Sequence, residues 1–284
     1  MAKTRGIYEL VELSENVTKL TMIRQNVYEG AIPNDLLEEI THAKIVNVKD
    51  LHAKYARCGK VVDVEVRTAI AERMRNWKGE LTEDQEEIFR KCERLSEGEA
   101  WKDMKSPASD VKMSIQFHQQ EKGERSIATG RAEGIADCTA EEACAWLYNF
   151  CSNDRMDSSR EEGNPAHIEV SEGLHSENMG TFAMVKKMPF IFRDREFVIR
   201  YIWRVDRKKS RASVAIWPAS DAVDYGGKQR KSVRAVAKGL FVATNIVDGT
   251  MKQKRCLVVY YQVRARTTRD KQACNEPRLN IIIQ

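Results

Sequence analysis

The sequence lacks the motifs that mark common enzyme classes and membrane spans. It contains no G-x-S-x-G, no H-E-x-x-H and no G-x-x-x-x-G-K-[ST] motif, the signatures of serine hydrolases, zinc peptidases and phosphate-binding loops. No apolar run approaches the roughly 18 residues that a membrane-spanning helix needs. Residues 1–8 carry Lys3 and Arg5 without an apolar stretch, which predicts no secretory signal. These absences predict a non-enzymatic protein that does not cross a bilayer.

The cysteines follow no pattern either. There are 7 of them, an odd number at irregular spacing with no C-x-x-C pair, which fits neither a zinc site nor a disulfide framework. As reduced, buried thiols they predict a cytosolic or nuclear compartment, and we expect a cytoplasmic protein, peripheral at membranes. His167, Glu169 and His175 lack the spacing of a closed metal site. No metal and no cofactor are therefore expected.

Charge is present in both signs but is unevenly distributed. Residues 1–100 hold 16 Lys+Arg against 19 Asp+Glu, and the remaining 31 Lys+Arg and 23 Asp+Glu lie in residues 101–284, a net charge of +8. Part of this excess is a basic run from Arg204 to Arg211, expected at the tip of a hairpin. Because few aromatic residues are interleaved with the basic ones, we expect a transient contact with an anionic membrane surface and no nucleic acid.

Helical patterns dominate the first third of the chain. Apolar residues at spacings of three and four predict a helix, namely Val62, Val66, Ile70, Met74 and Trp77. Thr82 and Gln85 are spaced as a capping box that opens a second helix. We therefore expect residues 1–82 to form a helical N-terminal extension, which could bind a protein partner.

After Trp101 the pattern changes to that of strands. Apolar residues alternate with polar ones over Val111–Phe117, which predicts a strand. A strand interrupted by glycines is expected at Ser126–Ala136, and a second capping box follows at Thr139–Glu142. Further strands are expected at Thr181–Met188, Glu196–Val205, Ala212–Ser220, Ser232–Thr244 and Cys256–Ala265. The short connections leave no room for crossover helices, so the sequence predicts an α+β domain at residues 83–284 with an antiparallel meander.

Three stretches carry a family resemblance through their order and spacing. They are Asp137–Glu142, Asp194–Val198 with Arg200 and Trp203 beyond it, and Ala219–Asp221 with Asp224–Gly226 and Val233–Ala235 after it. With them, residues 88–263 resemble a START domain, the steroidogenic-regulator-related lipid-transfer family. Residues 74–92 are also similar to the linker that precedes START modules in multidomain algal and protist proteins.

The resemblance implies a helix-grip fold, in which a curved antiparallel sheet surrounds an apolar cavity closed by a C-terminal lid helix. It implies non-catalytic binding and intermembrane transfer of a lipid, phospholipid or sterol-like, with entry at the loop of residues 221–231. Residues 267–284 show no helical periodicity and contain Pro277, so we expect the lid helix to be truncated or missing. Phe182 and Tyr201 stand where some sterol-binding members bury a charged pair, which argues against a sterol.

Eight residues are predicted to contact the lipid: Phe182, Met184, Ile199, Tyr201, Trp203, Ile216, Tyr225 and Arg234. Their alternative role is ordinary sheet core. Arg200, Arg204 and Arg234 could bind a lipid phosphate, but each could instead pair with a carboxylate.

Two other functions stay open. The domain could be a lipid-sensing or scaffold module that docks a protein partner through the N-terminal helices, in which case side chains would fill the cavity. It could also be a helix-grip cyclase or hydratase, which would need convergent titratable groups inside the cavity. Glu133 and Asp137 are the candidates for such an acid–base pair.

Overall fold

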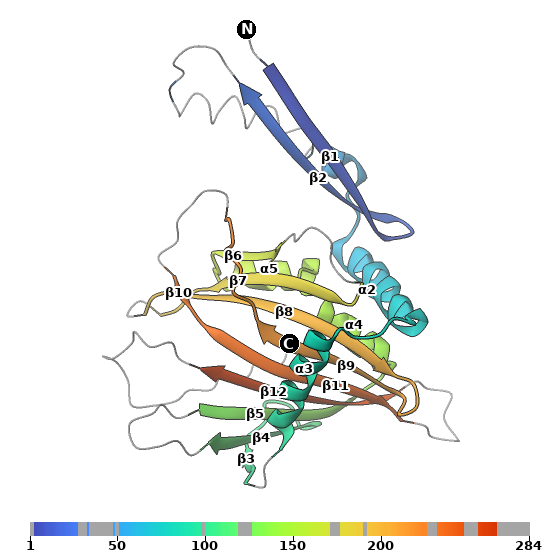
Figure 1. Ribbon diagram of the computed structural model, residues 1–284, viewed down its shortest axis with the longest axis vertical. Helices are drawn as coiled ribbons and strands as arrows, with labels where there is room; N and C mark the ends of the chain where they lie inside the picture. Colours follow the sequence, from blue (N-terminus) through green and yellow to red (C-terminus); the bar gives the residue numbers. More distant parts are fainter. Residues whose placement is uncertain are drawn as a thin grey trace. The chain divides into compact units, whose positions relative to one another are not determined.

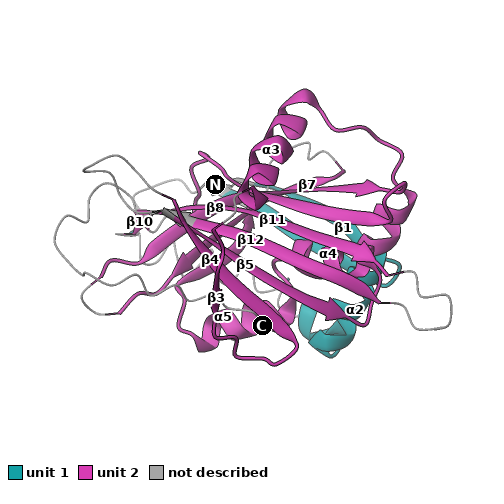
Figure 2. Cartoon of the chain, turned by 90° about the horizontal axis from the view of Figure 1, so that it is seen from below, with its two compact units in different colours: residues 1–69 teal, residues 70–284 magenta. Residues whose placement is uncertain are grey.

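The structure is a computed structural model of the 284-residue chain. It describes residues 3–27, 33, 48, 51–97, 100–118, 127–170, 177–189, 192–225, 232–246 and 255–265. The chain divides into two compact units, residues 1–69 and 70–284, coloured separately in Figure 2. Residues 267–284, where we expect the lid helix to be truncated or missing, lie outside the described residues. So do residues 226–231 of the expected entry loop.

The first unit begins with a hairpin. β1 (Lys3–Ser14) and β2 (Val17–Val27) pair in antiparallel register from Lys3 with Val27 to Ser14 with Val17. The prediction that residues 1–82 are helical is therefore wrong for this segment. Its apolar residues occur in adjacent pairs, such as Ile7-Tyr8, Leu10-Val11 and Met22-Ile23, so no clear strand period is visible in the sequence. The predicted helix is present further along as α2 (Gly59–Asn76), which begins in the first unit and ends in the second.

The second unit contains one open sheet of 10 strands (Figure 1). Its strand order is β3-β4-β5-β12-β11-β9-β8-β7-β6, and neighbouring strands in this order are antiparallel. β10 pairs with β8 in parallel. The strands are β3 (Lys102–Met104), β4 (Val111–His118), β5 (Ile127–Ala136), β6 (Ala166–Val170), β7 (Met179–Lys186), β8 (Arg195–Asp206), β9 (Arg211–Pro218), β10 (Val233–Arg234), β11 (Val236–Asn245) and β12 (Cys256–Ala265). A large antiparallel sheet with a few helices confirms the predicted α+β class.

The strand order corrects one part of the sequence prediction. The chain runs as a meander from β6 to β12, but β5 pairs with β12 and not with the next strand, β6. Two helices, α4 (Ala140–Tyr148) and α5 (Asn153–Glu161), separate β5 from β6, which lies at the opposite edge of the sheet. Only α4 was expected, because α5 is almost entirely polar and has no apolar periodicity.

Both predicted capping boxes are present. The Gln85 amide donates to Thr82 Oγ1 at 3.3 Å at the start of α3 (Glu83–Glu93), which is followed by the short 3₁₀ helix η1 (Arg94–Ser96). At the start of α4, the Glu142 amide donates to Thr139 Oγ1 at 3.2 Å, and the Thr139 amide donates back to Glu142 Oε2 at 2.8 Å. Each box satisfies amides that a helix start leaves unpaired.

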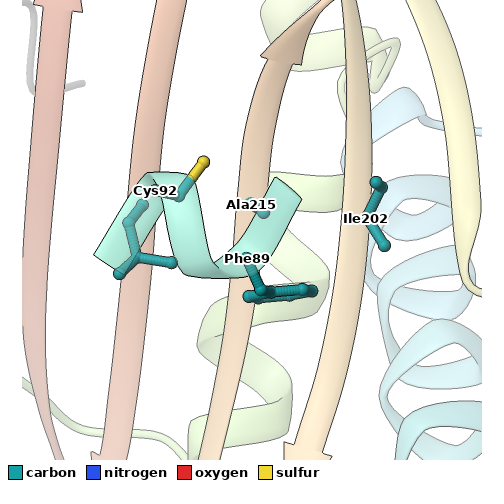
Figure 3. Packing of buried hydrophobic residues seen from close by; sticks show 5 residues of the cluster. Phe89, Cys92, Ile202 and Ala215 are labelled. Atoms are coloured by element: carbon teal, nitrogen blue, oxygen red, sulfur yellow. The ribbon is translucent and has the colours of Figure 1, made fainter. Parts of the chain in front are cut away.

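Helices pack on both faces of the sheet. We call outer the face that carries Ile202, Ala215 and Leu240, against which α3 packs with Phe89 and Cys92 (Figure 3). Directly paired residues share a face, so the opposite, inner face can be followed from strand to strand. One row crosses it along Trp203, Val214, Phe241, Tyr260, Ala132 and Met113. Phe150, which follows α4, contacts this inner face.

Candidate functional site

Six of the eight predicted lipid-contacting residues lie together on the inner face. Pairing places Phe182 opposite Ile199 and Tyr201 opposite Ile216, which puts neighbouring positions of β7, β8 and β9 on one surface. The six are Phe182, Met184, Ile199, Tyr201, Trp203 and Ile216. All of them are buried except Met184, which is half-buried.

Tyr225 and Arg234 lie on the other face. The Tyr225 hydroxyl donates to Glu196 Oε1 at 2.8 Å, and Arg234 Nε lies 3.0 Å from Glu196 Oε2. Glu196 shares the outer face with Val198, against which Tyr225 also packs. The structure therefore does not bring these two residues to the other six. The sequence could not show this, because it depends on β10 pairing with β8.

Each arginine that was considered for phosphate binding is paired with a carboxylate. Arg200 Nη2 lies 3.2 Å from Asp221 Oδ2, Arg204 pairs with Glu93, and Arg234 pairs with Glu196 as described above. A carboxylate partner neutralises the charge that a lipid phosphate would need. These three arginines therefore form ion pairs, which is the alternative that the sequence left open.

The candidate acid–base pair is likewise engaged by arginines. Glu133 pairs with Arg131, and Asp137 Oδ1 lies 3.3 Å from Arg255 Nε. Glu133 is on the outer face, because the residues on either side of it, Ala132 and Gly134, are on the inner one. These two carboxylates do not converge on the inner face.

Aromatic rings fill the inner face over β6, β7 and β8. The Phe150 ring centroid lies 4.4 Å from that of His167, 5.2 Å from that of Phe182 and 5.5 Å from that of Tyr201. Further along β8, the Trp203 and Trp77 rings contact each other edge-on, with their centroids 5.1 Å apart. Contacts this close are those of a packed core. That these residues also contact a lipid stays a prediction.

Glycine makes part of this packing possible. A Cβ built on Gly180 would stand 3.0 Å from Phe182 Cζ and 3.1 Å from the Tyr148 hydroxyl. The two aromatic side chains therefore lie directly over the Gly180 backbone, where a larger residue would displace them.

Further across the inner face, β5 presents only small side chains. We call these residues the β5 row: Ala128, Gly130, Ala132 and Gly134. On one side the row is flanked by the apolar inner residues of β4, which are Val111, Met113, Ile115 and Phe117. On the other side it is flanked by Val258, Tyr260 and the polar Gln262 of β12. Gly130, Ala132, Met113 and Ile115 are buried, whereas Ala128, Gly134 and Val111 are half-buried, so the row leaves part of its apolar surface uncovered.

Some of the apolar surface near this row is exposed. Phe117 is 53% exposed and Trp146, on α4, is 37% exposed. Val258 and Tyr260 are half-buried. Exposed aromatic side chains beside a half-buried apolar surface are typical of a ligand-binding or interaction site.

A cationic residue that the sequence did not reveal lies beside this surface. Arg155 is on α5, where its Nη1 donates to the Leu147 carbonyl at 3.1 Å and its guanidinium carbon lies 4.3 Å from the Trp146 ring centroid. Burial lowers the pKa of Arg155, while Tyr201 and Tyr260 raise it. Because α5 shows no apolar periodicity, nothing in the sequence pointed to this arginine.

Tyr201 is the polar group of the predicted set. It is 4% exposed, and burial raises the pKa of its phenol, with Tyr260 acting in the same direction and Arg155 in the opposite one. The hydroxyl therefore stays protonated at neutral pH and can donate a hydrogen bond.

Two surface pockets lie away from the β5 row. One, of about 570 Å³, is lined by Glu93 and by residues 204–209 at the tip of the β8–β9 hairpin. The other, of about 440 Å³, lies beside β6 and is lined in part by Met156, His167 and Tyr225. In the described part of the chain, no three His, Cys, Asp or Glu side chains are grouped as metal ligands. No helix among the described residues is long and apolar enough to span a bilayer.

No family model and no curated protein matches the sequence. Similar solved structures include a STAR-related lipid transfer protein from Xanthomonas axonopodis, at 15% identity over 60% of this chain and 83% of that chain, with a TM-score of 0.42. Human STARD10 is also 15% identical, over 69% of this chain and 73% of its own, with a TM-score of 0.43. Norcoclaurine synthase from Thalictrum flavum is 10% identical over 55% and 70%, with a TM-score of 0.27. Likeness at this level does not establish a shared ligand.

Proposed function

We propose that the second unit binds one lipid on the inner face of its sheet and carries it between membranes without changing it chemically. The β5 row, flanked by the apolar residues of β4 and β12, is the observation that supports this proposal. An apolar chain of the lipid would lie along the row, with its more polar end toward Tyr201.

The dimensions and the physics of the row suit such a ligand. From Ala128 to Gly134 the strand advances by roughly 20 Å, at about 3.3 Å per residue. Every square ångström of apolar surface that leaves water there contributes about 25 cal/mol. No covalent chemistry is required, which agrees with the carboxylates Glu133 and Asp137 being held in ion pairs.

Entry of the lipid is proposed at the loop that follows β9. Its described part is held to the outer face by the Arg200–Asp221 ion pair and by the hydrogen bond from Tyr225 to Glu196. Both contacts join half-buried groups, and a hydrogen bond to a charged group contributes about 1.5–3 kcal/mol. Transient loss of the two would release the loop at the end of β9, where the lipid would pass around the strand ends to the inner face.

A substitution on the β5 row tests the proposal. Ala132→Phe places a ring where the lipid chain would lie, so we expect it to abolish retained lipid and lipid transfer. Ile135→Phe is the matched control, because Ile135 is on the outer face of the same strand and is 51% exposed. Retained lipid is measured by native mass spectrometry of the purified full chain. Transfer is measured with fluorescent phosphatidylcholine moving between donor and acceptor vesicles.

The outcomes separate lipid transfer from the scaffold alternative. A wild-type protein that retains no lipid and transfers none would contradict the proposal and favour a scaffold. The packed rings over β6 to β8 and the exposed Leu10 and Ile23 of the hairpin are the observations that favour a scaffold. Because Ala132→Phe could disturb folding, Ala132→Val is measured beside it, and thermal unfolding is recorded for both. Transfer that is unchanged in a folded Ala132→Phe protein would place the lipid elsewhere.

A further inference from the structure

Arg155 forms no ion pair with a carboxylate among the described residues, although the charge of Asp154, its neighbour in the chain, acts on it. Among the described residues it donates a hydrogen bond from Nη1 to the Leu147 carbonyl, and its guanidinium stacks on Trp146. The other arginines near the sheet differ, since Arg200, Arg204 and Arg234 each face a carboxylate. A guanidinium has five N–H donors, so most of those of Arg155 remain available.

The surroundings of Arg155 make an anion favourable there. The arginine is half-buried, and protein atoms crowd it enough to lower its pKa by desolvation. A cation removed from water costs free energy unless an anion or hydrogen-bond acceptors compensate. Its charge acts on the phenols of both Tyr201 and Tyr260, which are on the inner face. The guanidinium, stacked on Trp146 of α4, therefore acts through its charge on Tyr201 of the aromatic cluster and on Tyr260 beside the β5 row.

We infer that Arg155 binds the anionic head group of an amphiphile, a phosphate or a carboxylate, whose apolar chain lies along the β5 row. This inference rests on the proposed function and adds the class of lipid. The Tyr201 hydroxyl, which has no hydrogen bond to any described residue, is placed to donate to the same anion. Arginine suits this role because its planar fork matches the oxygens of phosphate and carboxylate.

An amphiphile explains the site better than a free anion does. Trp146, on which the guanidinium stacks, is 37% exposed, and the inner residue Phe117 is 53% exposed. A small soluble anion would leave this apolar surface in contact with water, whereas a lipid chain would cover it. The charge and the apolar surface together therefore select a molecule that has both parts.

Two lipids that differ only in the head group test the inference. Oleoyl lysophosphatidate and monooleoylglycerol carry the same chain, with and without a phosphate, and their affinities for the full chain are measured by isothermal titration calorimetry. We expect the wild-type protein to bind the phosphate-bearing lipid about tenfold or more tightly, the effect of one hydrogen-bonded charge. Arg155→Gln should reduce that ratio to about one, and Arg155→Lys should keep part of the preference.

Arg160→Gln is the matched control, since Arg160 is on the same helix, is exposed and pairs with Asp157. It should leave the preference intact. Equal binding of the two lipids by the wild-type protein would overturn the inference and leave the proposed function standing, as would a preference that survives Arg155→Gln. Binding of inorganic phosphate alone, lost in Arg155→Gln while both lipids bind equally, would show a free-anion site instead. Binding of neither lipid would overturn the proposed function itself.

Discussion

His167 shows how burial at one residue sets a dependence on pH. Its ring is 9% exposed and stacks against Phe150, and Nε2 bonds to the Phe150 carbonyl at 2.9 Å. The carbonyl accepts, so Nε2 carries the proton and Nδ1 is left without a hydrogen-bond partner in the structure. Burial lowers the pKa of His167, and the charge of Arg155 lowers it further, while the bond to the Phe150 carbonyl raises it. The folded protein therefore holds this imidazole neutral.

We predict that acidification destabilises the protein through His167. Because the folded pKa lies below the unfolded value of about 6.5, the unfolded state binds more protons between the two values. Stability is thus complete above the unfolded pKa and falls as the pH drops below it, by at most about 1.4 kcal/mol per pH unit for one proton. Urea unfolding of the wild type and of His167→Gln across this range measures the difference.

The His167→Gln protein should lose this part of the slope, because Gln carries no titrating group but can still donate to the Phe150 carbonyl. His52→Gln is the control, since His52 is exposed, and it should keep the wild-type slope. An identical pH dependence in the wild type and His167→Gln would show that the ring is not held neutral by the fold.

At the scale of elements, α3 depends on a single aromatic anchor. Phe89 is fully buried against Ile202 and Leu240, and the Arg204 guanidinium covers its ring at 4.2 Å from the centroid (Figure 3). The Thr82 capping box starts the helix, but an 11-residue helix is marginal without packing. Docking on the outer face of the sheet therefore stabilises α3.

We predict that Phe89→Ala lowers the free energy of unfolding by about 3–5 kcal/mol, the usual cost of a buried Phe truncation and its cavity. Glu87→Ala, an exposed change on the same helix, should cost less than about 1 kcal/mol. Chemical denaturation of both variants gives the comparison. A Phe89→Ala cost as small as that of Glu87→Ala would mean that α3 is not anchored to the sheet.

At the scale of the whole molecule, charge is the property that would direct the protein to a membrane. The net +8 of residues 101–284 includes the basic run at the β8–β9 hairpin tip, where the structure confirms a turn between Asp206 and Arg211. Part of this run is structural, since Arg204 pairs with Glu93 and Arg207 donates to the carbonyls of Arg75 and Trp77. Lys208 and Lys209 are exposed.

We predict that Lys208→Glu combined with Lys209→Glu weakens association with phosphatidylserine-containing vesicles by roughly tenfold or more, since each basic residue near an anionic surface contributes about 1 kcal/mol. Binding of the wild type should also fall as salt is raised, because salt screens the attraction. Cosedimentation with vesicles measures both effects. Lys102→Glu combined with Lys112→Glu makes the same change of net charge on the exposed β3 and β4 positions. If this control weakens binding equally, net charge and not the hairpin is responsible.

Local chemistry determined much of the fold from the sequence alone. The capping boxes at Thr82 and Thr139 each need only residues three positions apart, and both are present. Apolar runs bounded by turn residues located β4, β5, β7, β8, β9, β11 and β12, and alternation at a period of two supported β4, β7 and β8. The same alternation on β7, β8 and β9 brought six predicted residues to one face, Tyr201 and Phe182 among them.

Only the tertiary structure decided which strands pair and what covers each face. The β5–β12 pair joins residues more than a hundred positions apart, and no local pattern encodes that contact, so the β5 row could not be seen in the sequence. For the same reason the sequence did not show that Tyr225 and Arg234 lie on the outer face, apart from the other six, and Arg155 was not found at all. The role of a charged residue depends on its neighbours in space: carboxylates face Arg200 and Arg204, whereas Arg155 stacks on the ring of Trp146.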